Sequence, residues 1–163
     1  MEAIHTASTT PGAPHLARRG AMVGRARALL ADRRVLIADD NAGDVKYLAT
    51  TLGIISGHGC EIITAPSLKK TIEAIQQHIF ALAFLDDRMS GIEKFEHSMP
   101  KLRAAGYPGP VIVVSGFISP DRRRSLFELG AVDAIHKDDL EGLRISEAIV
   151  RAMGCGPGET GQI

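Results

Sequence analysis

Cysteine is scarce in this sequence, which excludes two classes of small protein. Cys60 and Cys155 are its two cysteines, and they belong to no CxxC pair and to no cluster with histidine. A disulfide framework and a zinc site are therefore not expected, and both thiols suit a reducing cytoplasm.

Net charge is absent too. The 19 basic and 19 acidic side chains cancel, so the chain has a formal net charge of zero. No overall field therefore attracts the protein to nucleic acid, anionic lipid or acidic substrates. Any recognition through charge must come from a local cluster of residues.

Long hydrophobic runs are missing as well. The longest apolar runs have the length of strands, and the N-terminus has no uninterrupted stretch like the core of a signal peptide. We therefore expect a protein without a membrane span that stays in the cytoplasm.

What is present is enough apolar sequence for one domain. Hydrophobic residues make up 45% of the 163 residues, and a single core commonly takes roughly 100 to 200 residues. We expect a folded domain over 34–153, a flexible N-terminal extension over 1–33 with a short helix at 23–33, and a flexible tail over 154–163. Met22 is an alternative to Met1 as the natural start, and we expect no attached output domain.

Short apolar runs alternate with segments of helical periodicity from Arg34 onward, which is typical of βα units around a parallel sheet. The expected strands are 35–38, 60–65, 80–85, 111–114 and 131–136. The expected helices are 44–53, a helix capped by Ser67, 99–105, 122–129 and 140–153. Gly53 and Pro100 set two of these boundaries, because glycine favours a helix end and proline fits a first turn.

Acidic residues follow two of the expected strands. Asp39 and Asp40 come directly after the first strand, and Asp86 and Asp87 come directly after the third. The carboxyl ends of parallel strands meet at one edge of the sheet, where ligands bind in folds of this class. Carboxylates that converge repel one another unless a cation neutralises them, and oxygen ligands suit Mg²⁺.

A hydroxyl and an amine follow the remaining two strands. Ser115 comes after the fourth strand and Lys137 after the fifth, so both belong to the same edge as the acids. Mg²⁺ bridges carboxylates to phosphate oxygens, so this pocket could guide a phosphoryl group onto a carboxylate. Ser115 and Lys137 would then stabilise the incoming charge. Either residue alone would be unremarkable, and the prediction depends on all of them together.

The segments VLIADDN, FLDDRMSG, VSG and HKDD, in this order, resemble the CheY-like receiver domains of two-component response regulators. The resemblance covers about residues 34–153 and implies a five-stranded parallel sheet, doubly wound in the flavodoxin-like (βα)5 manner, with strand order 2-1-3-4-5. It also implies a stand-alone signalling domain that catalyses only its own phosphorylation and dephosphorylation. The implied partners are a histidine kinase or phosphotransfer protein as donor and a downstream protein as target. We expect no DNA-binding domain in this chain.

The same resemblance implies a role for each residue of the site. Asp86 is the phosphoacceptor, and Asp40 and Asp86 bind Mg²⁺ directly, whereas Asp39 acts largely through water. The backbone carbonyl of Arg88 supplies another metal ligand. The implied contacts to the phosphoryl group are Ser115, Gly116 and Lys137.

Asp86 and Asp87 compete for the acceptor role, and their positions relative to the next turn favour Asp86. Asp86 stands three residues before Met89 and five before Gly91, as in the family turn. Asp87 is one residue out of register, and its side chain would point to the opposite side if the strand continued.

Several residues depart from the family pattern. Ser90 and Asp138 stand where prolines are usual, and Lys94 stands where a turn glycine is common. Ala134 occupies the place where many members carry a tyrosine or phenylalanine that swings inward when the hydroxyl engages phosphate. How this chain would transmit phosphorylation is therefore left open.

Two alternative functions remain from the sequence. Arg122, Arg123 and Arg124 could bind an anionic nucleotide such as cyclic di-GMP and make the chain a ligand-binding adaptor, although such a run is more often the solvated face of a helix. A phosphatase of the haloacid-dehalogenase type also uses an aspartate after a strand, but it requires Asp-x-Asp, and Asp86-Asp87-Arg88 does not supply that motif.

Overall fold

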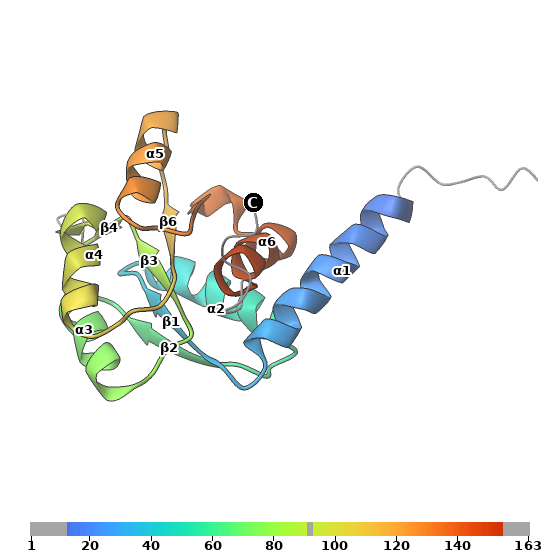
Figure 1. The fold of residues 1–163 in the computed structure, drawn as a ribbon, viewed down its shortest axis with the longest axis horizontal. Helices are drawn as coiled ribbons and strands as arrows, with labels where there is room; N and C mark the ends of the chain where they lie inside the picture. The colour runs from blue at the N-terminus through green and yellow to red at the C-terminus, as the bar shows by residue number, and fades with distance from the viewer. Residues whose placement is uncertain (1–12, 91–92, 155–163) are drawn as a thin grey trace, which may run out of the picture.

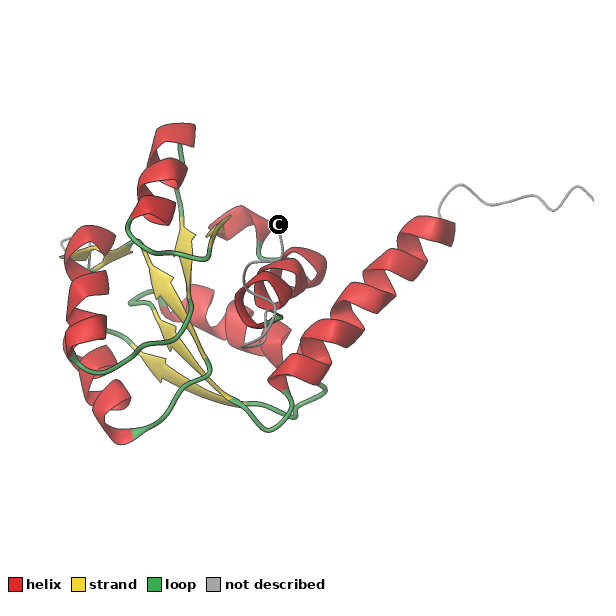
Figure 2. Ribbon diagram, viewed as in Figure 1, coloured by secondary structure: helices red, strands yellow, loops and turns green. Residues whose placement is uncertain are grey.

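The computed structural model describes residues 13–90 and 93–154. Residues 1–12 of the predicted N-terminal extension (1–33) and residues 155–163 of the predicted C-terminal tail (154–163) lie outside the described residues, as does Gly91 of the acceptor turn. The main sheet of the described part lies between two groups of helices (Figures 1 and 2).

The sheet has five parallel strands in the spatial order β2-β1-β3-β6-β7. The strands are β1 (Arg34–Ala38), β2 (Glu61–Ala65), β3 (Leu82–Asp86), β6 (Val111–Ser115) and β7 (Asp133–His136). Every residue of β3 and β6 is buried, because helices cover both faces of these central strands. Counted along the chain, the order is 2-1-3-4-5, so the predicted flavodoxin-like fold is confirmed.

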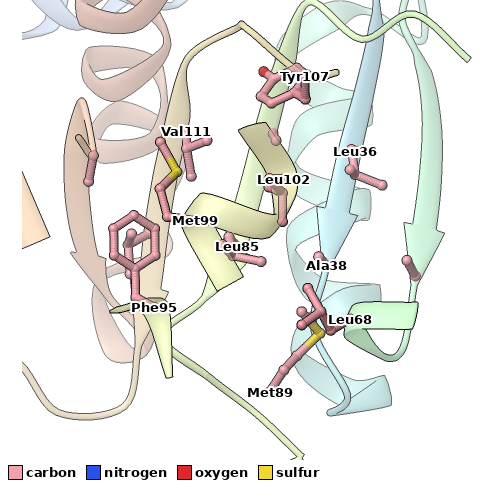
Figure 3. Packing of buried hydrophobic residues seen from close by; sticks show 14 of the residues in the cluster. Leu36, Ala38, Leu68, Leu85, Met89, Phe95, Met99, Leu102, Tyr107 and Val111 are labelled. Atoms are coloured by element: carbon pink, nitrogen blue, oxygen red, sulfur yellow. The ribbon is translucent and has the colours of Figure 1, made fainter. Parts of the chain in front are cut away.

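Helices pack against the sheet through two hydrophobic clusters. The helices are α1 (Ala13–Leu30), α2 (Ala42–Ser56), α3 (Leu68–Gln77), α4 (Phe95–Ala104), α5 (Pro120–Glu128) and α6 (Gly142–Met153). On one face Leu68 of α3 and Met99 of α4, both labelled in Figure 3, join the core. Leu126 of α5 belongs to the same cluster. On the other face Leu52 of α2 and Ile149 of α6 do the same.

Capping residues fix the starts of the helices near the carboxyl edge of the sheet. Asn41 accepts a hydrogen bond from the Asp44 N–H at 3.0 Å, and this cap starts α2 directly after the acids that follow β1. Ser119 accepts from the Arg122 N–H at 3.0 Å and precedes Pro120 in the first turn of α5. These short links bring the helix starts close to the strand ends.

Two predicted helix boundaries are wrong. Helix α2 continues past Gly53 and ends at Gly57, which has a φ of 62° and donates back to the carbonyls of Gly53 and Ile54. Helix α4 begins at Phe95, so Pro100 lies inside it and not in its first turn. Proline has no N–H to donate to the Glu96 carbonyl, yet burial of one face of α4 in the core keeps the helix intact.

The N-terminal helix α1 begins at Ala13 and ends at Leu30, so both predicted boundaries of the helix at 23–33 are wrong. Its C-terminal half is anchored: Ala26 and Leu30 are fully buried against α2 and α6. The Arg27 side chain donates to the carbonyls of Ile55 at 2.9 Å and Ile54 at 3.2 Å, which lie in the last turn of α2. Residues 15–21 are exposed, and this half of α1 projects away from the sheet (Figure 1).

A short hairpin follows β3 and was not predicted. Its strands β4 (Arg88–Met89) and β5 (Glu93–Lys94) pair in antiparallel fashion, and Ser90 between them has a φ of 56°. A 3₁₀ turn, η1 (Lys137–Asp139), separates β7 from α6. Within the part of the chain that the structure describes, no helix combines the length and apolar character needed to cross a membrane.

Candidate functional site

A cavity of about 650 Å³ opens at the carboxyl ends of β1, β3, β6 and β7. Chain segments that are far apart in sequence meet here, because parallel strands all end at this edge. The residues that line the cavity are Asp40, Asn41, Asp86, Asp87, Arg88, Ser115, Gly116, Phe117, Arg122 and Lys137. The sequence-predicted acids, serine and lysine are therefore brought to one place.

Three carboxylates converge at the cavity. Asp39, Asp40 and Asp86 each place one oxygen so that the three atoms lie within 4.8 Å of one another. The side chain of Asp39 is held by the Asn41 N–H, which donates to its Oδ1 at 2.9 Å. Asp39 and Asp86 are buried, whereas Asp40 is exposed to incoming solutes. An all-oxygen set with several negative charges fits a hard divalent cation such as Mg²⁺.

The buried position of Asp86 and its proximity to Asp39 change the pKa of its carboxyl group. Burial raises that pKa to about 7, and the negative charge of Asp39 adds to the rise. The Arg88 N–H, which donates to Asp86 Oδ1 at 3.2 Å, and the charge of Lys137 both act in the opposite direction. A divalent cation at this position would oppose the rise in pKa and favour the ionised carboxylate of Asp86.

Lys137 reaches across the cavity and contacts three acids. Its Nζ lies 2.8 Å from Asp44 Oδ2, 3.2 Å from Asp39 Oδ2 and 3.4 Å from Asp86 Oδ2. Burial lowers the pKa of Lys137, but the hydrogen bond to Asp44 and the charges of Asp86 and Asp39 outweigh it and raise the pKa above its ordinary value. Lys137 is therefore a fixed cation next to the oxygen atoms of Asp86.

Asp44 is a site residue that the sequence reasoning missed. It lies in the first turn of α2, and its carboxylate is the nearest of the three acids to Lys137. The signal available in the sequence was its place three residues after the capping Asn41, which puts it near the same edge of the sheet.

Ser115 is at the cavity, but its hydroxyl is engaged within its own loop. Its Oγ donates to the Phe117 carbonyl at 2.9 Å and accepts from the Phe117 N–H at 3.3 Å. A contact between this hydroxyl and a group on Asp86 would therefore require rotation of the side chain. Gly116 follows it, and a Cβ built there would meet no atom within 4 Å, which leaves room for a ligand.

Asp87 has a different environment from Asp86. Its buried carboxylate accepts two hydrogen bonds from Arg122, one from Nε to Oδ2 at 3.1 Å and a shorter one from Nη2 to Oδ1. Arg122 thereby neutralises Asp87, while Asp86 faces Asp39, Asp40 and Lys137. The two neighbouring acids therefore lie in different electrostatic environments, Asp87 beside Arg122 and Asp86 beside further acids and Lys137.

The three consecutive arginines of α5 do not form one anion site. Arg122 pairs with Asp87 and Glu96, whereas Arg123 Nη1 lies 3.8 Å from the buried Asp133 and Arg124 Nη1 lies 3.8 Å from Asp121. Of the three, Arg122 alone lines the cavity. The predicted alternative of a nucleotide site on Arg122, Arg123 and Arg124 therefore finds no support.

Comparisons with known proteins agree with this architecture. A family model described as the response regulator receiver domain matches residues 35–148. The search of curated proteins gives no match.

Solved structures resemble the chain over most of the folded part. The crystal structure of FixJ-N is 25% identical, with a TM-score of 0.62, and the match covers 76% of this chain and 94% of that one. NtrX from Brucella abortus is 24% identical, with a TM-score of 0.66 and coverage of 76% and 27%. A response regulator protein from Burkholderia pseudomallei with a phosphorylated aspartic acid, calcium ion and citrate is 20% identical, with a TM-score of 0.60 and coverage of 75% and 66%. At these identities, the latter two are informative about the fold alone.

Proposed function

The chain belongs to the response regulator receiver domain family of two-component systems, and from that premise we propose that it accepts a phosphoryl group on Asp86 in a reaction that depends on Mg²⁺. The family consists of signalling domains and not of enzymes in the usual sense. The observation that carries the proposal is the convergence of carboxylate oxygens from Asp39, Asp40 and Asp86 beside the ammonium of Lys137.

The donor in this proposal is a phosphohistidine on a histidine kinase or phosphotransfer protein, which receiver domains imply as partner. An oxygen of Asp86 forms the new O–P bond while the P–N bond of the donor breaks. The electron pair of that bond stays on the imidazole nitrogen. The cavity is open to solvent at Asp40, so a donor side chain has a path to Asp86.

Each residue of the site has a part in this transfer. The ammonium of Lys137 already contacts Asp86 Oδ2 and would stabilise the charge of the phosphoryl oxygens. The hydroxyl of Ser115 would turn from Phe117 toward the same oxygens, and the space beside Gly116 would admit them. Asp39, Asp40, Asp86 and the backbone carbonyl of Arg88 would hold Mg²⁺, which offsets negative charge between carboxylates and phosphate.

One structural relative supports the chemistry by analogy. The Burkholderia pseudomallei response regulator contains a phosphorylated aspartic acid and a calcium ion. Its fold matches this chain, and the acids of this chain offer the oxygen ligands that such an ion requires. The output in this proposal is a change in contacts with a downstream protein.

Treatment with acetyl phosphate and Mg²⁺, followed by intact mass spectrometry, tests the acceptor assignment. The wild-type chain should gain the mass of one phosphoryl group, and Asp86→Asn should gain none. Asp87→Asn is the matched control and should still be modified, because Asp87 is occupied by Arg122. Modification of Asp86→Asn to the wild-type level would refute the assignment.

A further inference from the structure

The buried acid next to the acceptor joins three elements. Asp87 follows β3, and its N–H donates to the Val114 carbonyl of β6 at 3.0 Å. Its own carbonyl accepts from the Phe95 N–H, the first residue of α4, at 2.9 Å. Its carboxylate holds Arg122 from the first turn of α5. A change at Asp86 therefore reaches α4 and α5 through its immediate neighbour in the chain.

Arg122 connects the two helices directly. Its guanidinium is hydrogen-bonded to Asp87 on one side and lies 2.5 Å from Glu96 Oε1 of α4 on the other. The contacts of Arg122 with Asp87 and with Glu96 differ in hydrogen-bond geometry. Asp87 receives two hydrogen bonds, whereas the Glu96 Oε1 atom is buried without a partner in hydrogen-bonding geometry. The contact with Glu96 is therefore the weaker of the two and the one that yields first.

Arg122 also lines the cavity that contains Asp86, so it is within the field of whatever group Asp86 carries. A phosphoryl group brings roughly two negative charges. Lys137 is already shared among three acids, and Arg122 is balanced by Asp87 and Glu96, which together exceed its charge by one. Added negative charge at Asp86 favours a position of the guanidinium nearer to the cavity and farther from Glu96.

We propose that the bridge Asp87–Arg122–Glu96 transmits the charge state of Asp86 to α4. In the unphosphorylated protein Arg122 ties α4 to α5. Phosphorylation draws the guanidinium toward Asp86, the contact with Glu96 is lost, and the N-terminal part of α4 moves. This inference rests on the proposed function of Asp86. Many receiver domains have a tyrosine or phenylalanine at the position of Ala134 that changes its orientation on phosphorylation. Ala134 is fully buried and has no ring, so the bridge gives this chain a different coupling route.

The test follows backbone amides by NMR during titration with beryllofluoride and Mg²⁺, a stable stand-in for the phosphoryl group. In the wild type, amides at Ser115 and Lys137 and those of α4 and α5 should all shift. In Glu96→Gln, which keeps the shape but removes the charge, Ser115, Lys137 and α5 should still shift, while the shifts over α4 fall by at least half. Arg122→Gln should lose the response of both helices and keep that of Lys137.

Arg124→Gln is the matched control, because Arg124 lies on the same helix with 72% of its side chain exposed and should respond like the wild type. If α4 in Glu96→Gln shifts as in the wild type, coupling runs through the Phe95 hydrogen bond instead and the inference is overturned. If Ser115 and Lys137 do not respond in the wild type, the proposed function itself fails. Glu96→Gln leaves both hydrogen bonds to Asp87 intact, so it remains informative even if Arg122→Gln does not fold.

Discussion

At the scale of single residues, the contrast between Asp86 and Asp87 is the most informative feature of the molecule. They are neighbours in sequence and both are buried, yet Arg122 binds the carboxylate of Asp87 while Asp86 faces two further acids. The charge on Asp87 is satisfied inside the protein. Asp86 instead shares a single cation, Lys137, with Asp39 and Asp44, which leaves negative charge that a metal ion can neutralise.

The raised pKa of Asp86 makes stability depend on pH in a defined window. Its folded-state value of about 7 lies above the ordinary 3.8, so between these values the folded protein holds a proton that the unfolded chain has released. Stability therefore falls as the pH rises through this window. Asp86→Asn removes that loss, so above pH 7 and without Mg²⁺ it should be more stable than the wild type by roughly 1–3 kcal/mol.

Urea denaturation in EDTA from pH 4 to pH 8 measures this effect. The advantage of Asp86→Asn should be absent at the acid end and should grow toward neutrality. Asp121→Asn serves as control, since 92% of its side chain is exposed, and it should show no gain. A difference between Asp86→Asn and wild type that is constant over the whole range would contradict the assignment.

At the scale of elements, α1 shows how one helix divides into an anchored part and a projecting part. The last two turns bury Ala26 and Leu30 against the face of the sheet that α2 and α6 also cover, and Arg27 caps the carbonyls at the end of α2. The first turns expose Leu16. Leucine thus occurs on one helix both buried, at Leu30, and exposed, at Leu16, so the effects of substitution at the two positions can be compared.

We expect Leu30→Ala to lower the free energy of unfolding by about 3 kcal/mol, because it removes a fully buried side chain and leaves a cavity. Leu16→Ala, at a position 66% exposed, should change it by less than about 0.5 kcal/mol. Chemical denaturation of both variants under identical conditions measures the difference. Equal effects of the two substitutions would mean that α1 does not pack on α2 and α6 in solution.

At the scale of the whole molecule, the metal site should couple ligand binding to folding. Asp39 and Asp40 follow β1, and Asp86 is the last residue of β3. These two strand ends lie side by side only in the folded chain. A cation that binds them stabilises the fold by mass action, by about 2.7 kcal/mol at a hundred times its Kd. We therefore expect Mg²⁺ to raise the midpoint of thermal unfolding of the wild-type protein.

Asp40→Asn is the variant that isolates this effect. Asp40 is exposed, so without Mg²⁺ the substitution should leave the melting temperature nearly unchanged. With Mg²⁺ the stabilisation should be largely lost, because one of the three carboxylates is missing. Equal stabilisation of Asp40→Asn and wild type by Mg²⁺ would place the ion elsewhere.

Much of the fold was already readable from the sequence, because the features that specify it are local. The apolar runs of β3 and β6 and the cap Ser67 act over a few residues each. Errors arose where tertiary packing overrode a local rule. Burial of Met99 and Phe95 keeps α4 helical around Pro100, and contacts with α2 and α6 stabilise α1.

The sequence by itself determined the parallel sheet and the edge at which Asp39, Asp40, Asp86, Ser115 and Lys137 assemble, because parallel strands that alternate with helices must all end on one side. The order of the strands followed from the resemblance to receiver domains. Only the tertiary structure decided the pairings between side chains: Lys137 with Asp44, and Arg122 with Asp87 and Glu96. These contacts join residues from different helices and strands, and their geometry depends on how the elements pack rather than on any local sequence pattern.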